Sequence, residues 1–197
     1  GSAAHVHQSL FKGDTNVFHD ANAKLTMSDT MKSYVAGLIK YAPDMTVFLA
    51  PYVNSYKRFL PGTFAPTKIA WSVDNRTAGY RLVGDGTKGV RIECRIPGSD
   101  INPYLACAAQ LAAGIAGMEE KLSLEEPVSG DVYNMTNIPE IPNTLRAATE
   151  TLRSSDMLRK AMGDDVIDHY TRAAEVEQEA FDAVVTDWEL QRGFERA

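Results

Sequence analysis

The hydrophobic pattern of the chain changes once, near residue 100, and this change limits the architectures that it can adopt. Before that point, short strand-like runs are separated by Gly, Asn, Asp and Pro; they are HVHQSLF, TKIAWSV, TAGYRLV and GVRIECRI. After Asn102 the chain has long segments with helical spacing. We therefore predict an α+β fold, in which an antiparallel sheet from the strand-rich residues 1–100 is covered by helices from residues 101–197. The close spacing of the runs after Pro66 favours an antiparallel meander.

Three helical segments are predicted. The first interrupts the strand-rich part, where Ser28 suits an N-cap and apolar residues recur every three or four positions until Pro43. The second begins after Asn102, with Pro103 at its first position and an Ala-rich run suited to close packing on a sheet. The third is a long acidic helix whose apolar face we interpret as core scaffold; this face comprises Ile167, Tyr170, Ala174, Phe181, Val185 and Trp188.

Composition argues against several classes of partner. A net charge of -6 disfavours general binding to nucleic acid or to anionic lipid, because both require a surplus of Lys and Arg. No stretch of the sequence approaches the roughly 20 apolar residues of a membrane span. Cys94 and Cys107 lie in apolar runs and are typical of reduced core thiols. We expect a cytoplasmic protein without nucleic-acid or membrane partners.

The middle of this acidic chain is locally basic. Eight of the 20 basic residues lie between Lys57 and Arg95, against three acidic residues. Strand alternation in RIECR places Arg91, Glu93 and Arg95 on one face and predicts that two guanidiniums frame one carboxylate. This pattern allows a solvated face with cross-strand ion pairs, or an anion site in which Glu93 also holds a divalent cation.

Two histidines near the start of the chain raise a similar question. His5 and His7 are two positions apart, so on a strand their rings project from the same face. They can present two imidazoles to a metal or phosphate, or they can be ordinary strand residues.

Four blocks in order make the chain similar to a known family: GSAAHVHQSL, NSYKRFLPGTFAP, WSVDNRTAGYR and KGVRIECRIPGSDINPYLA. Together they resemble the C-terminal half of the catalytic domain of the glutamine synthetase family, most densely over residues 1–122. The resemblance implies a ligase that uses ATP to phosphorylate the γ-carboxylate of glutamate, after which an amine displaces phosphate. It also implies Mg²⁺ or Mn²⁺ as cofactor and a homo-oligomer whose sites are shared between subunits.

The resemblance also assigns site residues. Its metal ligands correspond to His5 and Glu93, its glutamate contacts to Gly1, Arg58 and Arg95, and its ATP contacts to His7, Ser9, Arg76, Arg81 and Lys88. Arg76 further corresponds to the arginine that serves the phosphate and substrate region. A site that gathers polyphosphate, glutamate and a transferring phosphoryl group needs cations, which agrees with the basic middle of the chain.

One loop departs from the pattern of ammonia-using members, which carry Tyr-Glu where this chain has Thr63 and Phe64. A phenyl ring excludes water but offers no anionic oxygen to ammonium, so we predict that Arg58, Arg76 and Phe64 serve catalysis with an organic amine. This loop resembles the γ-glutamylpolyamine or γ-glutamylamide synthetase branch. The alternatives are an ammonia-using enzyme in which Phe64 only packs the loop, a catalytically silent structural relative, and an isolated nucleotide-binding domain.

Family members carry further metal-binding glutamates and an N-terminal domain upstream of the segment seen here. We therefore expect the chain to be a fragment that is inactive alone, binds metal weakly, exposes a sheet edge and self-associates.

Overall fold

The computed structural model describes residues 2–196, which form a mixed α/β fold. Its strands are β1 (Val6–Gln8), β2 (Phe11–Lys12), β3 (Thr15–Asn16), β4 (Trp71–Val73), β5 (Tyr80–Val83) and β6 (Arg91–Cys94). Its α-helices are α1 (Asp29–Lys40), α2 (Thr46–Leu49), α3 (Val53–Tyr56), α4 (Pro103–Glu119), α5 (Leu145–Arg153), α6 (Asp156–Met162), α7 (Asp164–Asp182) and α8 (Asp187–Arg196). Two 3-10 turns are η1 (Lys24–Thr26) and η2 (Val132–Asn134).

The main sheet has the strand order β1-β6-β5-β4, and β2 pairs with β3 in a separate hairpin. Strand β6 pairs antiparallel with both β1 and β5, as predicted. The antiparallel meander is wrong for β4 and β5, which run parallel with Trp71 opposite Tyr80. The reason is the loop of residues 74–79, which carries the chain back to the start of β4. Asp74 enters this loop with a φ of 45°, and the Asn75 side chain accepts a hydrogen bond from Thr77 N at 2.9 Å.

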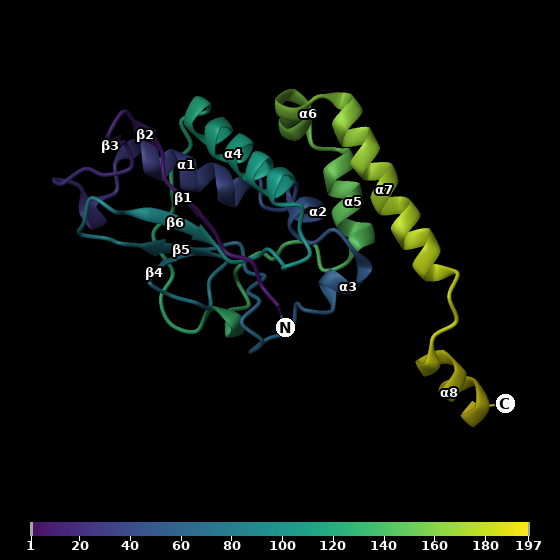
Figure 1. Ribbon diagram of the computed structural model, residues 1–197. Coiled ribbons are helices and arrows are strands. Elements are labelled where there is room, and N and C mark those ends of the chain that lie inside the picture. The colour runs from purple at the N-terminus through teal and green to yellow at the C-terminus, as the bar shows by residue number, and fades with distance from the viewer. Residues whose placement is uncertain (1, 197) are drawn as a thin grey trace.

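Helices α1 and α4 lie side by side and cover one face of the sheet (Figure 1). Ser28 caps α1 by accepting from Met31 N, and Asn102 caps α4, where Pro103 takes the first position, as predicted. The core between helices and sheet includes Tyr34, Leu38, Tyr80, Leu82 and Ile92, all fully or almost fully buried. The prediction of an α+β fold with a helix-covered sheet is confirmed.

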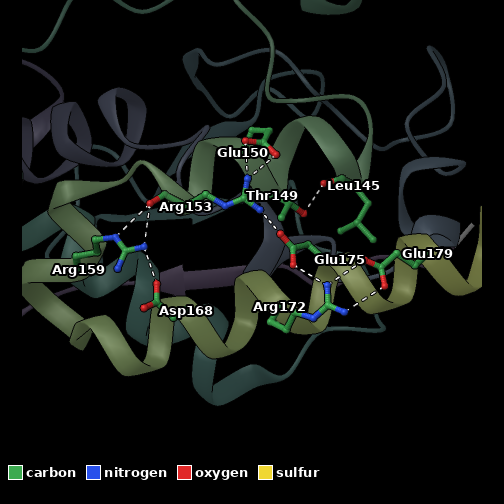
Figure 2. A network of polar contacts seen from close by, with 9 residues as sticks. All are labelled: Leu145, Thr149, Glu150, Arg153, Arg159, Asp168, Arg172, Glu175 and Glu179. Carbon is green, nitrogen blue, oxygen red and sulfur yellow. Dashed lines mark hydrogen bonds and ion pairs between the residues drawn. The ribbon is translucent and has the colours of Figure 1, made fainter.

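Helices α5 and α7 pack together and are joined by a chain of ion pairs (Figure 2). Arg153 of α5 binds Glu175 of α7, and Arg172 Nη1 donates to Glu175 Oε2 at 2.9 Å within α7. Arg159 of α6 donates to Asp168 Oδ1 at 2.7 Å. Because most of these groups are exposed, the network contributes little to the stability of the fold.

The long acidic helix predicted at the C-terminal end is divided in two. Helix α7 stops at Asp182, and α8 lies apart from the rest of the molecule (Figure 1). Ile167 and Ala174 are buried as predicted, but Val185 and Trp188 are 66% and 64% exposed. Phe181, near the end of α7, is also 37% exposed, so the expectation of one continuous core face is wrong from Phe181 onward.

The two cysteines are free but lie in different surroundings. Cys94 of β6 is buried, as predicted, whereas Cys107 is exposed because it lies on the face of α4 that points away from the sheet. Among residues 2–196, no helix is both long enough and apolar enough to cross a membrane.

Candidate functional site

A buried carboxylate stands at the centre of the polar face of the sheet. Glu93 lies on β6, and its side chain is only 2% exposed. Arg81 Nη1 of β5 donates to Glu93 Oε2 at 3.0 Å, and Arg95 Nη1 donates to Glu93 Oε1 at 2.6 Å. Burial of a charge is costly unless it is paired and hydrogen-bonded, and these two guanidiniums meet that requirement. This face is therefore not solvated at Glu93, although the cross-strand ion pair of that interpretation is present between Arg81 and Glu93.

The sequence correctly predicted that two guanidiniums bind Glu93, but it named one of the two arginines wrongly. Arg91 was expected to frame Glu93, yet its Nε donates to His7 Nδ1 at 3.2 Å. Arg81 takes that place because the β5–β6 register sets it directly opposite Glu93. Directly opposed residues on paired strands are closer than neighbours two positions apart on one strand.

The two histidines face the same carboxylate. His5 Nδ1 lies 3.0 Å from Glu93 Oε1, and His7 Nε2 lies 3.8 Å from the same oxygen. Burial lowers the pKa of both imidazoles below the ordinary value, and Arg95 adds to this effect at His5. Neutral imidazoles are therefore favoured near neutral pH, and a neutral ring nitrogen is the form that binds metal.

His5 and Glu93 suit adjacent ligands of one divalent cation. Two donors on neighbouring corners of an octahedron with bonds of about 2.1 Å are separated by about 3 Å, as these two atoms are. Within the part of the chain that the structure describes, no group of three or more His, Cys, Asp or Glu side chains could hold a metal ion. These residues thus fit a metal as a partial ligand set.

A cavity of about 360 Å³ opens beside this cluster. It is lined by Ser2, Ala3, His5, Arg58, Thr63, Phe64, Arg76 and Arg95. Arg58 Nη2 donates to the Ile96 carbonyl, whereas its Nε and Nη1 are buried without a protein partner among the described residues. Buried donors left unpaired are costly, so this guanidinium is an exception to the usual pairing of buried polar groups.

A second cavity of about 540 Å³ lies next to the first and is lined by Asp74, Asn75, Arg76, Arg81 and Gly130. Arg76 lines both cavities, and its carbonyl accepts from Arg95 Nε at 3.3 Å. The cluster therefore presents guanidiniums to two adjoining spaces, a chemistry that suits anionic groups.

A larger cavity of about 1020 Å³ lies elsewhere, between α1, α4 and α6. Its floor includes Leu111, Ala112 and Ile115, and its Lys40 and Lys160 already pair with Glu120 and Glu119. Because this cavity lacks the converging cations of the other two, its larger volume does not make it the candidate site.

Comparison with known proteins identifies the arrangement. A family model described as glutamine synthetase, catalytic domain, matches residues 1–193. The chain belongs to the glutamine synthetase family. The γ-glutamylethanolamide synthetase GlnA4 of Streptomyces coelicolor is 46% identical over 197 residues, which make up 100% of this chain and 42% of that protein. A glutamine synthetase of Thermus thermophilus is 42% identical over 199 residues, covering 98% of this chain and 45% of that protein.

Solved structures agree with the family assignment. A complex of GmaS with ADP has a TM-score of 0.90 and 28% sequence identity, covering 99% of this chain and 46% of that chain. The chain thus spans less than half the length of the relatives that it matches. The family and the fold that the sequence predicted are confirmed, and glutamine synthetases are ligases that use ATP and a divalent metal.

Most of the residues that the glutamine synthetase resemblance singled out lie together around Glu93. Ser9 is half-buried directly after β1, and Lys88 lies in the exposed β5–β6 turn. Lys88 lines neither the 360 Å³ nor the 540 Å³ cavity. Gly1, the remaining residue of the predicted set, lies outside the described residues.

Sequence reasoning missed three acidic or polar neighbours of the site. Asp74 accepts from Arg81 Nε at 3.0 Å, and Asn75 lines the second cavity. Asp100 accepts from Ser55 Oγ at 2.6 Å close to Arg58. Asp74 and Asn75 lie within WSVDNRTAGYR, the sequence block that contains Arg76, so the resemblance of that block could have indicated both residues. No spacing rule in the sequence connects Ser55 with Asp100.

Proposed function

We propose that residues 1–197 form the C-terminal portion of the catalytic domain of an ATP-dependent γ-glutamyl ligase that uses an organic amine. The observation that carries this proposal is the position of Phe64, which lines the 360 Å³ cavity together with Arg58, His5 and Arg95. Among the described lining residues of this cavity there is no carboxylate. A cavity that combines cations with an exposed phenyl ring suits glutamate and the carbon chain of an amine.

In this proposal, each part of the cluster has a role. Arg58 and Arg95 bind the carboxylates of glutamate, with Gly1 as a further contact, and Arg76 stabilises the phosphoryl group between the two cavities. His7, Ser9, Arg81 and Lys88 serve ATP. His5 and Glu93 hold Mg²⁺ or Mn²⁺, which would offset the charge of the phosphates. A complete metal shell needs further ligands, so residues 1–197 alone should bind metal weakly and lack activity.

Phe64 is held in an unusual backbone conformation. Its φ is 58°, and its side chain is 70% exposed, while Thr63 Oγ1 donates to the Leu60 carbonyl at 2.6 Å. A non-glycine residue in the left-handed region is uncommon, and such strain often marks a functional loop. The ring can exclude water from an acyl phosphate and contact a larger amine, but it cannot accept a proton from ammonium.

An ammonia-using glutamine synthetase is the second candidate. It is supported by the Thermus thermophilus relative, whereas the 46% identical relative is named for γ-glutamylethanolamide synthesis. A catalytically silent structural relative is disfavoured, because Arg58, Arg76 and Glu93 are present and converge. We also propose that the full-length protein is a homo-oligomer. We further propose that it lies in the cytoplasm, where a free thiol such as Cys94 stays reduced.

An amine panel tests the proposal. The full-length protein is assayed with ATP, glutamate and ammonium, methylamine, ethanolamine, putrescine or spermidine, with phosphate release and the γ-glutamyl product both measured. We expect kcat/KM for one organic amine to exceed that for ammonium. Higher kcat/KM for ammonium than for every organic amine would overturn the proposal in favour of a glutamine synthetase.

Loop variants test the role of Phe64 itself. Phe64→Glu should move preference toward ammonium by about tenfold or more, because a carboxylate then faces the amine. Leu60→Glu is the matched control, since Leu60 is exposed in the same loop but does not line the cavity. Equal effects of the two variants would show that loop charge, and not the position of Phe64, governs preference.

A further inference from the structure

A carboxylate and a hydroxyl contact each other behind Arg58. Ser55 Oγ donates to Asp100 Oδ2 at 2.6 Å and accepts from Tyr52 N at 3.0 Å. Ser55 is 3% exposed and lies in α3, and Arg58 follows this helix by two residues. Asp100 therefore anchors the short helix whose end carries the guanidinium.

Asp100 and Arg58 lie close to each other beside Gly98. A Cβ atom added to Gly98 would lie 3.4 Å from Arg58 Nε and would collide with Asp100 Oδ1. The Asp100 carboxylate and the Arg58 Nε thus both lie next to the space that a Cβ of residue 98 would fill. Burial lowers the pKa of the Arg58 guanidinium, and the Asp100 charge acts in the opposite direction.

Asp100 approaches Arg58 without occupying its free donors. Among the described residues no ion pair joins the two side chains, and Arg58 Nε and Nη1 remain buried without a protein partner. Arg58 Nη2 is fixed separately by the Ile96 carbonyl. The result is a guanidinium that lies close to a carboxylate, is held at one nitrogen and is buried without a protein partner at two others.

We propose that Asp100, acting through Ser55, is a positioning residue that holds Arg58 ready for the carboxylate of glutamate. This inference rests on the proposed function, in which Arg58 binds glutamate. The carboxylate orients α3 through the Ser55 hydroxyl and offsets the cost of burying the guanidinium, without taking up the N–H donors of Arg58, which lines the 360 Å³ cavity.

Steady-state kinetics of the full-length protein give the first test. Asp100→Asn keeps an oxygen for Ser55 but removes the charge, and Ser55→Ala keeps the charge but removes the bond. Each should raise KM for glutamate about tenfold, because hydrogen bonds to charged groups are worth roughly a factor of this size. KM for ATP and kcat should change less than twofold. Asp14→Asn, in an exposed turn, is the matched control and should change nothing.

Gly98→Ala supplies an independent variant, because its methyl group displaces the Asp100 carboxylate while every charge is retained. We expect the same rise in KM for glutamate, and little further rise when Gly98→Ala is combined with Asp100→Asn. An unchanged KM for glutamate in Asp100→Asn would overturn the proposal. So would a loss of kcat for all substrates together with a lowered Tm, which is the mark of a structural role alone.

A second readout does not depend on turnover. In the 197-residue chain, the buried Arg58 Nε–H should give a slowly exchanging ¹⁵N NMR signal, assigned by its loss in Arg58→Lys. Asp100→Asn and Gly98→Ala should shift this signal and speed its exchange severalfold, and Asp14→Asn should not. If the wild-type enzyme makes no γ-glutamyl product, the proposed function fails while this measurement still decides the positioning role; an unmoved signal refutes it.

Discussion

Cys94 and Cys107 show how two similar sequence runs lead to different chemistry. Both cysteines are flanked by apolar residues, but Cys94 points into the core from β6 and Cys107 points outward from α4. Burial raises the pKa of the Cys94 thiol to about 12. Since the thiolate is the reactive form, Cys94 should be inert in the folded protein.

Thiol labelling checks this expectation. At pH 8, one equivalent of maleimide should react rapidly with the native chain, and a second should react only in denaturant. Cys107→Ser should abolish the fast reaction, and Cys94→Ala should leave it unchanged. Rapid native labelling of two thiols would show that Cys94 is accessible, contrary to its position in the core.

The sequence predicted which face of the strand the site residues occupy, but it did not predict which side chains contact one another. Alternation in RIECR correctly placed Glu93 and Arg95 on the same side, whereas Arg81, predicted only as an ATP contact, also binds Glu93. Sequence alone could not pair Arg81 with Glu93, because that contact depends on the β5–β6 register. The contact of Ser55 with Asp100 was missed for the same reason, since it joins segments that meet only in the tertiary structure.

At the scale of elements, the closest packing is between α1 and α4. A Cβ atom added to Gly37 would lie 2.8 Å from the Gly117 Cα and would collide with the Ala113 carbonyl. Both obstacles are backbone atoms, so no side-chain rotation can relieve the contact. The Ala-rich helix was predicted to pack closely on a sheet, whereas its close backbone contact is with α1, and the sequence does not reveal which glycines meet.

Gly37→Ala should therefore destabilise the chain. Helix propensity favours Ala by about 1 kcal/mol, but overpacking of a core contact costs about 1–3 kcal/mol or more. We expect the clash to prevail and to lower the free energy of unfolding by about 2 kcal/mol in urea denaturation. Gly193→Ala in α8 is the control, because a Cβ there meets nothing within 4 Å. An unfolding midpoint for Gly37→Ala equal to that of the control would contradict the close contact.

Element boundaries and strand direction were the least predictable features. The apolar positions of Phe181 and Trp188 continue the helical period, yet the helix ends at Asp182 and these side chains stay partly or largely exposed. Periodicity reports which face is apolar but not whether another element covers it. Similarly, the short link between β4 and β5 suggested a hairpin, while the turn chemistry of residues 74–79 produces a parallel pair.

At the scale of the whole molecule, Arg58, Arg76, Arg81 and Arg95 line the two adjoining cavities, although the chain as a whole is acidic. The sheet face opposite this cluster is covered by α1 and α4, so the site has a rigid support (Figure 1). The edges of the main sheet are less completely covered than this face. Strand β1 is the edge of the main sheet, whereas at the other edge Val128 N donates to the Trp71 carbonyl at 3.0 Å.

The surface of α8 and the β1 edge of the sheet are both candidates for self-association. Val185, Trp188 and Phe194 are 66%, 64% and 85% exposed, and they lie on or next to α8, which stands apart from the body of the protein. Exposed apolar clusters and open strand edges both favour association. The 197-residue chain should therefore associate reversibly as its concentration rises, measured by sedimentation velocity over a hundredfold range.

Charge variants separate the two sources of association. Trp188→Glu combined with Phe194→Glu should shift the association to higher concentration by at least tenfold if α8 is responsible, because two apolar side chains are replaced by mutually repelling carboxylates. Gln191→Glu adds a charge to the same helix without removing apolar surface and should have a smaller effect. Association that the double variant leaves unchanged would point to the β1 edge instead. A chain that remains monomeric throughout the range would refute the prediction, because neither surface would then bind a second copy at these concentrations.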